Sequence, residues 1–234
     1  MADDRPKSNP KISLSEKCPR RVLVWDLPTR TFHWLLVLLV TVSFVTGKVG
    51  GTVMRYHEWS GVTILWLILF RVLWGFWGGA PSRFTSFVRG PRTVWAYART
   101  LWGKGHDVYL GHNPMGAWSI LALLTVLGIQ AGTGLFANDD IFTEGPLSQL
   151  VSKATSDGLT RVHLINQDIL MALIVLHLSA LIFYWAVKRE NLVLPMITGR
   201  RPWQHESARD ADGHPVKALV LAAILAAGVY WSIY

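Results

Sequence analysis

Two histidines in one apolar segment have the spacing to hold cofactors at two depths of a membrane. His163 and His177 lie 14 positions apart within residues 161 to 189. In an α-helix this spacing falls about 40° short of four turns and rises roughly 21 Å, so both rings leave one face. In a hydrocarbon core about 30 Å thick, one ring then lies toward each leaflet. A polar ring at either depth needs a partner, which is either a group on a neighbouring helix or a metal. Two histidines on one face of the helix favour two planar cofactors, each with a metal held by a histidine nitrogen.

The composition is that of a polytopic membrane protein. Of the 234 residues, 51% are hydrophobic and 16% are charged, and the charges concentrate between apolar runs. The formal charge of +8 comes from lysines and arginines in short loops beside those runs, which indicates an orientation signal and no nucleic-acid binding. Cys18 is the only cysteine, so an internal disulfide and a thiolate-bound iron–sulfur cluster are both excluded.

Five apolar segments predict the helices that position these histidines. They cover residues 33 to 47, 57 to 79, 116 to 136, 161 to 189 and 216 to 234. The fold expected is an all-α membrane protein, a four-helix transmembrane bundle with a fifth, peripheral helix at the C-terminus. The domains expected are a flexible cytoplasmic tail (1–20), the four-helix domain (21–190), a cytoplasmic linker (191–215) and the fifth helix (216–234). No strand pattern competes, and the loop from 80 to 115 forms either an interfacial helix or an ordinary loop.

The loop charges predict how the chain is oriented. The N-terminal tail and the loop from 80 to 115 are rich in lysine and arginine, and the segment after the fourth helix adds Lys188, Arg189, Arg200 and Arg201. The loop from 137 to 162 instead carries four acids against two bases. The positive-inside rule then makes the N-terminus cytoplasmic and the C-terminus periplasmic in a bacterial inner membrane.

This topology sorts four histidines into two pairs. His57 opens the second segment and shares the outer level with His163, whereas His33 opens the first and shares the inner level with His177. Each pair bridges two helices and could clamp one iron from both faces of a porphyrin. The remaining histidines lie in loops and are interpreted as solvated: His106, His112, His205 and His214.

Several neighbouring residues suit a bound macrocycle. Gly61 lies one turn after His57, where the missing side chain would admit a flat ring, although small residues also serve helix contacts. Arg71, 14 residues after His57 on the same face, needs an anion at its depth. We interpret that anion as a propionate, with snorkelling to lipid headgroups as the alternative. Three more arginines beside the histidines could bind propionates or lipid phosphates: Arg30, Arg55 and Arg161.

These residues resemble a known family. The segments VWDLPTRTFHW, HEWSG, FRVLWG and TGLF, with the two histidines of the fourth helix, are similar to bacterial di-haem cytochromes of the b561 group, which includes the cytochrome b subunits of nickel-iron hydrogenases. The similarity covers roughly residues 21 to 200. It implies two bis-histidine haems b, with His33, His57, His163 and His177 as ligands, and electron transfer between the quinone pool and a partner. The chain departs from the family pattern at two places. Leu164 stands where related chains often carry an acid, and the fifth helix lies outside the four-helix similarity.

The function expected is therefore transmembrane electron transfer. Filled axial positions argue against oxygen binding, and quinone or quinol is the expected redox substrate. The partner expected is a c-type cytochrome docked on the acidic loop or an oxidoreductase catalytic subunit. The alternatives are a haem-bearing membrane anchor, a quinone oxidoreductase that includes superoxide among its electron donors, and a proton-coupled transporter without haem. Whether the chain is itself an enzyme stays open.

Overall fold

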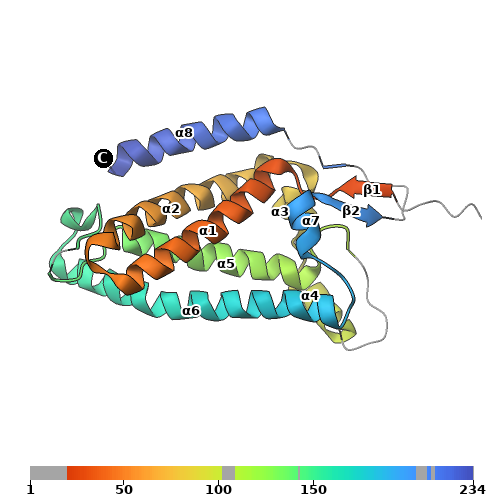
Figure 1. Ribbon diagram of the computed structural model, residues 1–234, viewed down its shortest axis with the longest axis horizontal. Helices are drawn as coiled ribbons and strands as arrows, with labels where there is room; N and C mark the ends of the chain where they lie inside the picture. The colour runs from red at the N-terminus through yellow and green to blue at the C-terminus, as the bar shows by residue number, and fades with distance from the viewer. Residues whose placement is uncertain (1–19, 102–108, 142, 204–209, 212–213, 234) are drawn as a thin grey trace, which may run out of the picture.

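Four long helices form a bundle, and a fifth lies along its outside (Figure 1). The computed structural model describes residues 20–101, 109–141, 143–203, 210–211 and 214–233; of the predicted tail (1–20), residues 1–19 lie outside them. The bundle helices are α1 (Leu27–Val49), α2 (Met54–Trp77), α5 (Pro114–Gly134) and α6 (Lys153–Ala186), and the outer helix is α8 (Pro215–Ile233). All five are long and apolar enough to cross a membrane, which confirms the predicted four-plus-one architecture.

Polar caps explain why the helices begin earlier than their apolar runs. The Asp26 carboxylate accepts from the Thr29 backbone N–H at 2.9 Å, and Pro28 occupies the first turn of α1, where its missing N–H does no harm. Asn113 caps α5 in the same way. Ser152 caps α6. This helix starts eight residues before the predicted segment, because the apolar run covers only the part of the helix that is buried in lipid.

The core joins the helices through large apolar side chains. One cluster contains Phe32, Leu67, Phe70, Trp74, Leu124 and Ala218, and a second contains Ile64, Ile68, Leu127, Ala131 and Leu170. Helix α8 packs on the first cluster, and Trp66 of α2 donates its indole N–H to the Ala222 carbonyl at 2.9 Å. The fifth helix is therefore fixed to α2, outside the bundle.

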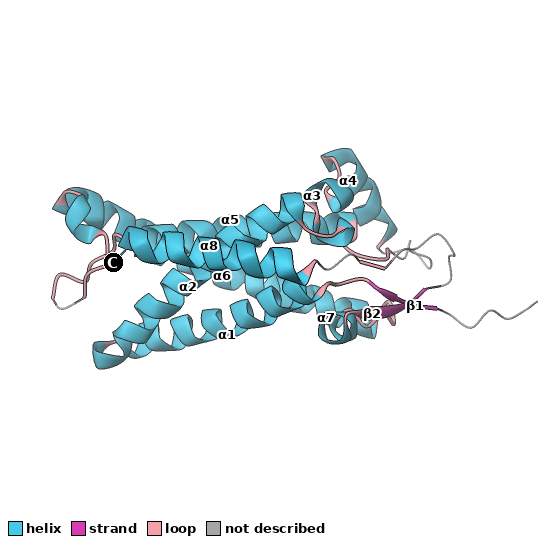
Figure 2. Ribbon diagram, turned by 90° about the horizontal axis from the view of Figure 1, so that it is seen from above, coloured by secondary structure: helices cyan, strands magenta, loops and turns pink. Residues whose placement is uncertain are grey.

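Two short strands correct the expectation that the chain has none. Strands β1 (Arg20–Leu23) and β2 (Arg200–Trp203) pair antiparallel, with Arg20 opposite Trp203 (Figure 2). Each has four residues, too few to show a period-two pattern, and the pairing joins segments far apart in sequence. Helix α7 (Val193–Thr198) and β2 lie within the predicted linker, so this segment has regular structure.

The remaining short elements occupy the two ends of the bundle. Helices α3 (Phe84–Phe87) and α4 (Pro91–Thr100) and the turn η2 (Ala80–Ser82) lie at the end that carries the strands, named here the inner end (Figure 1). The turn η1 (Gly51–Val53) and the loop with η3 (Ser148–Leu150) form the outer end. Helix α4 exposes Trp95 and buries Tyr97, so the loop from 80 to 115 does contain a two-faced helix.

Candidate functional site

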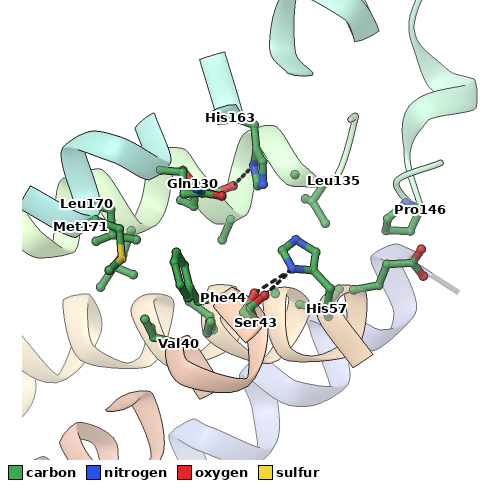
Figure 3. A pocket seen from close by; sticks show the side chains of 18 residues that line it. Val40, Ser43, Phe44, His57, Gln130, Leu135, Pro146, His163, Leu170 and Met171 are labelled. Carbon is green, nitrogen blue, oxygen red and sulfur yellow. Dashed lines mark hydrogen bonds between the residues drawn. The ribbon is translucent and has the colours of Figure 1, made fainter. Parts of the chain in front are cut away.

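A cavity between the four bundle helices opens near the outer end. His57 of α2 and His163 of α6 project into it from opposite walls and face each other (Figure 3). Their ring centroids are 6.0 Å apart, and the ring planes are inclined by 76°. The structure thus brings together the outer pair that helical spacing predicted.

The outward-facing nitrogen of each ring is held by a backbone carbonyl. The Nδ1 of His57 lies 2.8 Å from the Ser43 carbonyl oxygen on α1, and that of His163 lies 3.0 Å from the Gln130 carbonyl oxygen on α5. Because a carbonyl only accepts, each Nδ1 carries the proton and donates it. Each Nε2 then keeps its lone pair, and this is the arrangement by which metal-binding histidines are usually oriented.

Two glycines make these contacts possible. Gly47 follows Ser43 by four residues, and Gly134 follows Gln130 by four. A side chain at the fourth position lies over the carbonyl one turn earlier. A Cβ on Gly47 would lie 2.9 Å from the His57 Nδ1, and one on Gly134 would lie 3.0 Å from the His163 Cε1. On α1 and on α5, the missing side chain of the glycine therefore leaves room for the histidine ring to reach the carbonyl one turn earlier.

Replacing Gly47 by alanine should displace the His57 ring and weaken any metal complex of the outer pair. Loss of an outer-shell hydrogen bond typically lowers metal affinity about 10- to 100-fold. The measurement is titration of the purified apo-chain with haem, followed by its low-spin absorbance. Gly128→Ala is the matched control, because a Cβ there meets nothing within 4 Å. Equal haem affinity in both variants would contradict the role given to Gly47.

The outer pair fits a metal held between two axial nitrogens. Two metal–nitrogen bonds of about 2 Å, and about 1 Å from each nitrogen to its ring centre, span about 6 Å, the separation observed. Gly61 lines the cavity, and the space where its side chain would lie is open. Most other lining residues are apolar, among them Val62, Leu127 and Leu135. A flat, largely apolar group therefore fits.

The inner pair is also close together, with fewer fixed contacts. His33 of α1 lies near enough to His177 of α6 for their charges to interact. The Nδ1 of His33 is enclosed and has no hydrogen-bond partner among the described residues, and its ring lies edge-on to Trp34. An enclosed nitrogen without a partner is a candidate site for an additional group.

Arg71 lies within reach of the charge of a buried carboxylate, that of Asp26. Its side chain is 3% exposed, donates to the Ser82 carbonyl at 3.2 Å and lies over the Phe84 ring. The negative charge of Asp26 acts on the Arg71 guanidinium. The buried Asp26 carboxylate also accepts hydrogen bonds from the Trp74 indole N–H and the Ser82 hydroxyl, each at 3.3 Å. The signal available was Asp26 itself, an acid directly before the Leu-Pro that opens α1.

The other three arginines lie at the surface ends of their helices. Arg30 donates to the Ile197 carbonyl at 2.7 Å, and its Nε is enclosed without a partner in the described chain. Arg55 is exposed and lies against the Tyr56 ring. Arg161 is also exposed. Of the three, Arg30 is the one the structure places at the inner level beside His33.

His112 is not solvated, contrary to the prediction. Its ring lies 4.4 Å from the Trp25 ring and 4.5 Å from the Phe87 ring, and its Nδ1 is enclosed. Burial, with the nearby Arg71 charge, lowers the pKa of His112 to about 3. The prediction failed because the two aromatic neighbours are distant in sequence. His214 is exposed as expected, and His106 and His205 lie outside the described residues.

Comparison with known proteins identifies the family. A family model described as prokaryotic cytochrome b561 matches residues 24–199. The chain belongs to this family. Membership in the cytochrome b561 family implies a haem b, and it agrees with the five candidate spans in making this a multi-pass membrane protein.

The relatives of this cytochrome b561 family member are remote. A probable Ni/Fe-hydrogenase 1 B-type cytochrome subunit of Escherichia coli K12 is 26% identical over 140 residues, 49% of this chain and 60% of the relative. A probable Ni/Fe-hydrogenase B-type cytochrome subunit of Azotobacter vinelandii is 23% identical over 221 residues, 79% of this chain and 90% of the relative. The chain thus spans under two thirds of the first relative. No solved structure matches it.

Proposed function

We propose that the chain carries electrons across the membrane through two haems b, one held by His57 and His163 and one by His33 and His177. The observation that carries this proposal is the outer pair, whose rings face each other at 6.0 Å with both Nδ1 atoms bonded to carbonyls. Such an arrangement leaves the Nε2 lone pair of each ring available to bind a metal. Family membership supports the haem as the group between them.

The protein's part is to hold the ligands and exclude competing chemistry. The Ser43 and Gln130 carbonyls accept from the Nδ1–H of the outer imidazoles and so orient each ring with its Nε2 available to a metal. Each histidine pair would hold one haem iron through two nitrogens and so would leave no coordination position for oxygen, and a bound haem would supply one-electron redox chemistry. The 14 residues from His163 to His177 separate the two levels by roughly 21 Å along α6, so charge crosses the membrane without movement of an ionised side chain.

Quinone and a partner protein would be the two ends of this path. The names of the relatives support an oxidoreductase catalytic subunit as that partner. A c-type cytochrome on the acidic outer loop has weaker support, because Lys153 forms ion pairs with Asp140 and Asp157 and so offsets part of the negative charge. The positive-inside rule supports a cytoplasmic inner end, in the bacterial inner membrane.

A proton-coupled transporter without haem is the second candidate, and the observation that favours it is a carboxylate at the outer cavity. Glu58 lines the outer cavity beside His57, and Asp168 lies on α6 between the two histidine levels. Asp168 is exposed and does not line the cavity, so the two acids do not form one relay with the histidines.

A reduced-minus-oxidised spectrum of the purified chain decides between the candidates. We expect a b-type α-band and two haems per chain by the pyridine haemochrome assay. One haem per chain would leave only the outer pair as a site. Absence of a haem band in a chain purified from haem-sufficient cells would contradict electron transfer and favour the transporter.

A further inference from the structure

An apolar groove lies on the outside of the bundle near its inner end, and the proposed function does not use it. Helices α2 and α5 and the segment around α3 form its walls, through Val72, Phe76, Phe84, Val88, Leu121 and Leu124. Leu124 is buried, whereas Phe76 is 59% exposed, so the groove opens away from the bundle. In a membrane this opening faces lipid. Neither histidine pair contributes to these walls.

The groove begins at the level where a lipid head group lies. Trp118 of α5 donates its indole N–H to the Arg89 carbonyl at 2.9 Å, so the end of the α3 segment lies beside the first turns of α5 (Figure 2). Trp118 is 46% exposed, and exposed tryptophans near helix ends are typical of the head-group level. Thr125 also lines the groove and follows Trp118 by seven residues, which places it about 10 Å deeper. One leaflet of the hydrocarbon core is about 15 Å thick, so the groove follows most of one acyl chain.

Two arginines lie at the head-group end of the groove. Arg83 directly precedes α3, and Arg89 directly follows the wall residue Val88. The Arg83 Nε–H donates to the Gly78 carbonyl at 2.7 Å, and the Arg89 guanidinium donates to the Ser86 carbonyl at 2.8 Å. These bonds hold both side chains close to α3. Because the carbonyls are neutral, they leave both positive charges uncompensated.

No acid lies nearby in the sequence to offset these charges. Residues 59 to 106 contain no aspartate or glutamate. The described part of this stretch has four exposed arginines, and none of them forms an ion pair with a carboxylate that the structure describes: Arg83, Arg89, Arg92 and Arg99. A basic pocket between helices at a membrane surface attracts anionic head groups. This end of the groove therefore favours a ligand with a net negative charge.

We propose that this groove binds one anionic phospholipid, with an acyl chain along its walls and the phosphate on Arg83 and Arg89. A guanidinium offers a planar fork of N–H donors that matches the oxygens of a phosphate. An orientation signal would need arginines anywhere in the loop, whereas here two of them flank an apolar groove. A zwitterionic lipid fits less well, because its ammonium group would lie among the same uncompensated arginines. The site needs no haem and goes beyond the proposed electron transfer.

The test is native mass spectrometry of the purified chain in mild detergent, titrated with palmitoyl-oleoyl-phosphatidylglycerol or with phosphatidylcholine of the same acyl chains. We expect the first phosphatidylglycerol to bind more tightly than the first phosphatidylcholine. Glycerol 3-phosphate, which has the phosphate but no acyl chain, should not displace it. Equal affinity for the two lipids, or displacement by glycerol 3-phosphate, would contradict the proposed site.

The double variant Arg83→Gln/Arg89→Gln should bind phosphatidylglycerol about tenfold more weakly or worse, since a hydrogen bond to a charged group contributes about that factor. Arg92→Gln/Arg99→Gln is the matched control. It removes the same charge from α4, where Arg99 lies over the exposed Trp95 ring, and should leave the affinity near the wild-type value. An equal loss in both double variants would mean that the lipid responds to the total charge of this end, and would overturn the site.

Filling the groove tests the acyl-chain part of the site while both arginines remain. Thr125→Trp adds a large ring to the groove from an exposed position and should weaken phosphatidylglycerol binding. Ile129→Trp is its control, because Ile129 is exposed one turn farther along α5 and does not line the groove. Unchanged binding in Thr125→Trp would exclude the groove as the place of the acyl chain.

Photolabelling of the wild-type chain keeps the inference testable if a variant does not fold. A phosphatidylglycerol with a diazirine in one acyl chain should label peptides that contain residues 72 to 88 and 118 to 125. Label spread evenly over the exposed faces of α6 and α8, at the level found with the matching phosphatidylcholine probe, would overturn the site.

Discussion

Replacing His57 by alanine should halve the haem content, from two haems per chain to one. The variant removes one axial ligand of the outer pair, whereas the inner pair lies about four helical turns away along α6 and keeps both of its ligands. The measurement is the pyridine haemochrome assay on purified protein, together with the α-band of the remaining haem. His177→Ala should remove the other haem and leave the complementary spectrum.

His214→Ala is the control for His57→Ala, because His214 is exposed in the segment before α8. Added imidazole should restore the lost haem in His57→Ala, since the Ser43 carbonyl remains to accept from a free ring in the same place. An unchanged haem content in His57→Ala, or equal loss of both spectral components without rescue by imidazole, would show that the histidines are paired differently.

Replacing Asp26 by alanine should strongly destabilise the inner end. Asp26 is 1% exposed and caps α1 while accepting from Trp74 and Ser82. Its removal leaves the buried Trp74 and Ser82 donors without their acceptor and takes away a carboxylate charge that acts on the buried Arg71; each buried polar group left unsatisfied costs about 1–3 kcal/mol. Thermal unfolding in detergent, followed by tryptophan fluorescence, should show a large fall in the melting temperature.

The double variant Asp26→Ala/Arg71→Met separates the charge from the cap. If the unpaired guanidinium causes the loss, the second substitution should recover part of the stability, because no buried charge is then left uncompensated. Strictly additive losses would mean that Asp26 acts only through its hydrogen bonds. Asp26→Asn, which retains a cap but not the charge, should fall between the wild type and Asp26→Ala.

The helical period was enough to predict the bundle and the facing of His57 and His163. Membrane helices have long apolar runs and a fixed rise per residue, so depth and face follow from residue number. The carbonyl partners on α1 and α5 could not be predicted, because they depend on how neighbouring helices are aligned along their axes. Gly47 and Gly134 were the available signal.

The inner end was the least predictable part of the fold. A propionate as the partner of Arg71 stays a prediction, but the sequence of α2 gives no sign that folding also brings the Asp26 carboxylate from the segment before α1 into range of the guanidinium. His112 looked solvated between glycine and asparagine, yet it lies between Trp25 and Phe87. Contacts between loops and helix ends depend on pairs distant in sequence, for which a single chain has no periodic pattern.

Helix α6 has 34 residues and is therefore about 51 Å long, well beyond a hydrocarbon thickness of about 30 Å. Its first turns anchor the outer loop. The Asn138 backbone N–H donates to the Thr160 hydroxyl and the Asn138 side-chain N–H donates to the Asp157 carboxylate, each at 3.0 Å, and the Ser156 hydroxyl donates to the Phe136 carbonyl. A protein that docks on this end would bind a surface that is already preorganised by these hydrogen bonds. Association there loses little conformational entropy, so its rate and strength should respond to ionic strength more than to the length or flexibility of the loop.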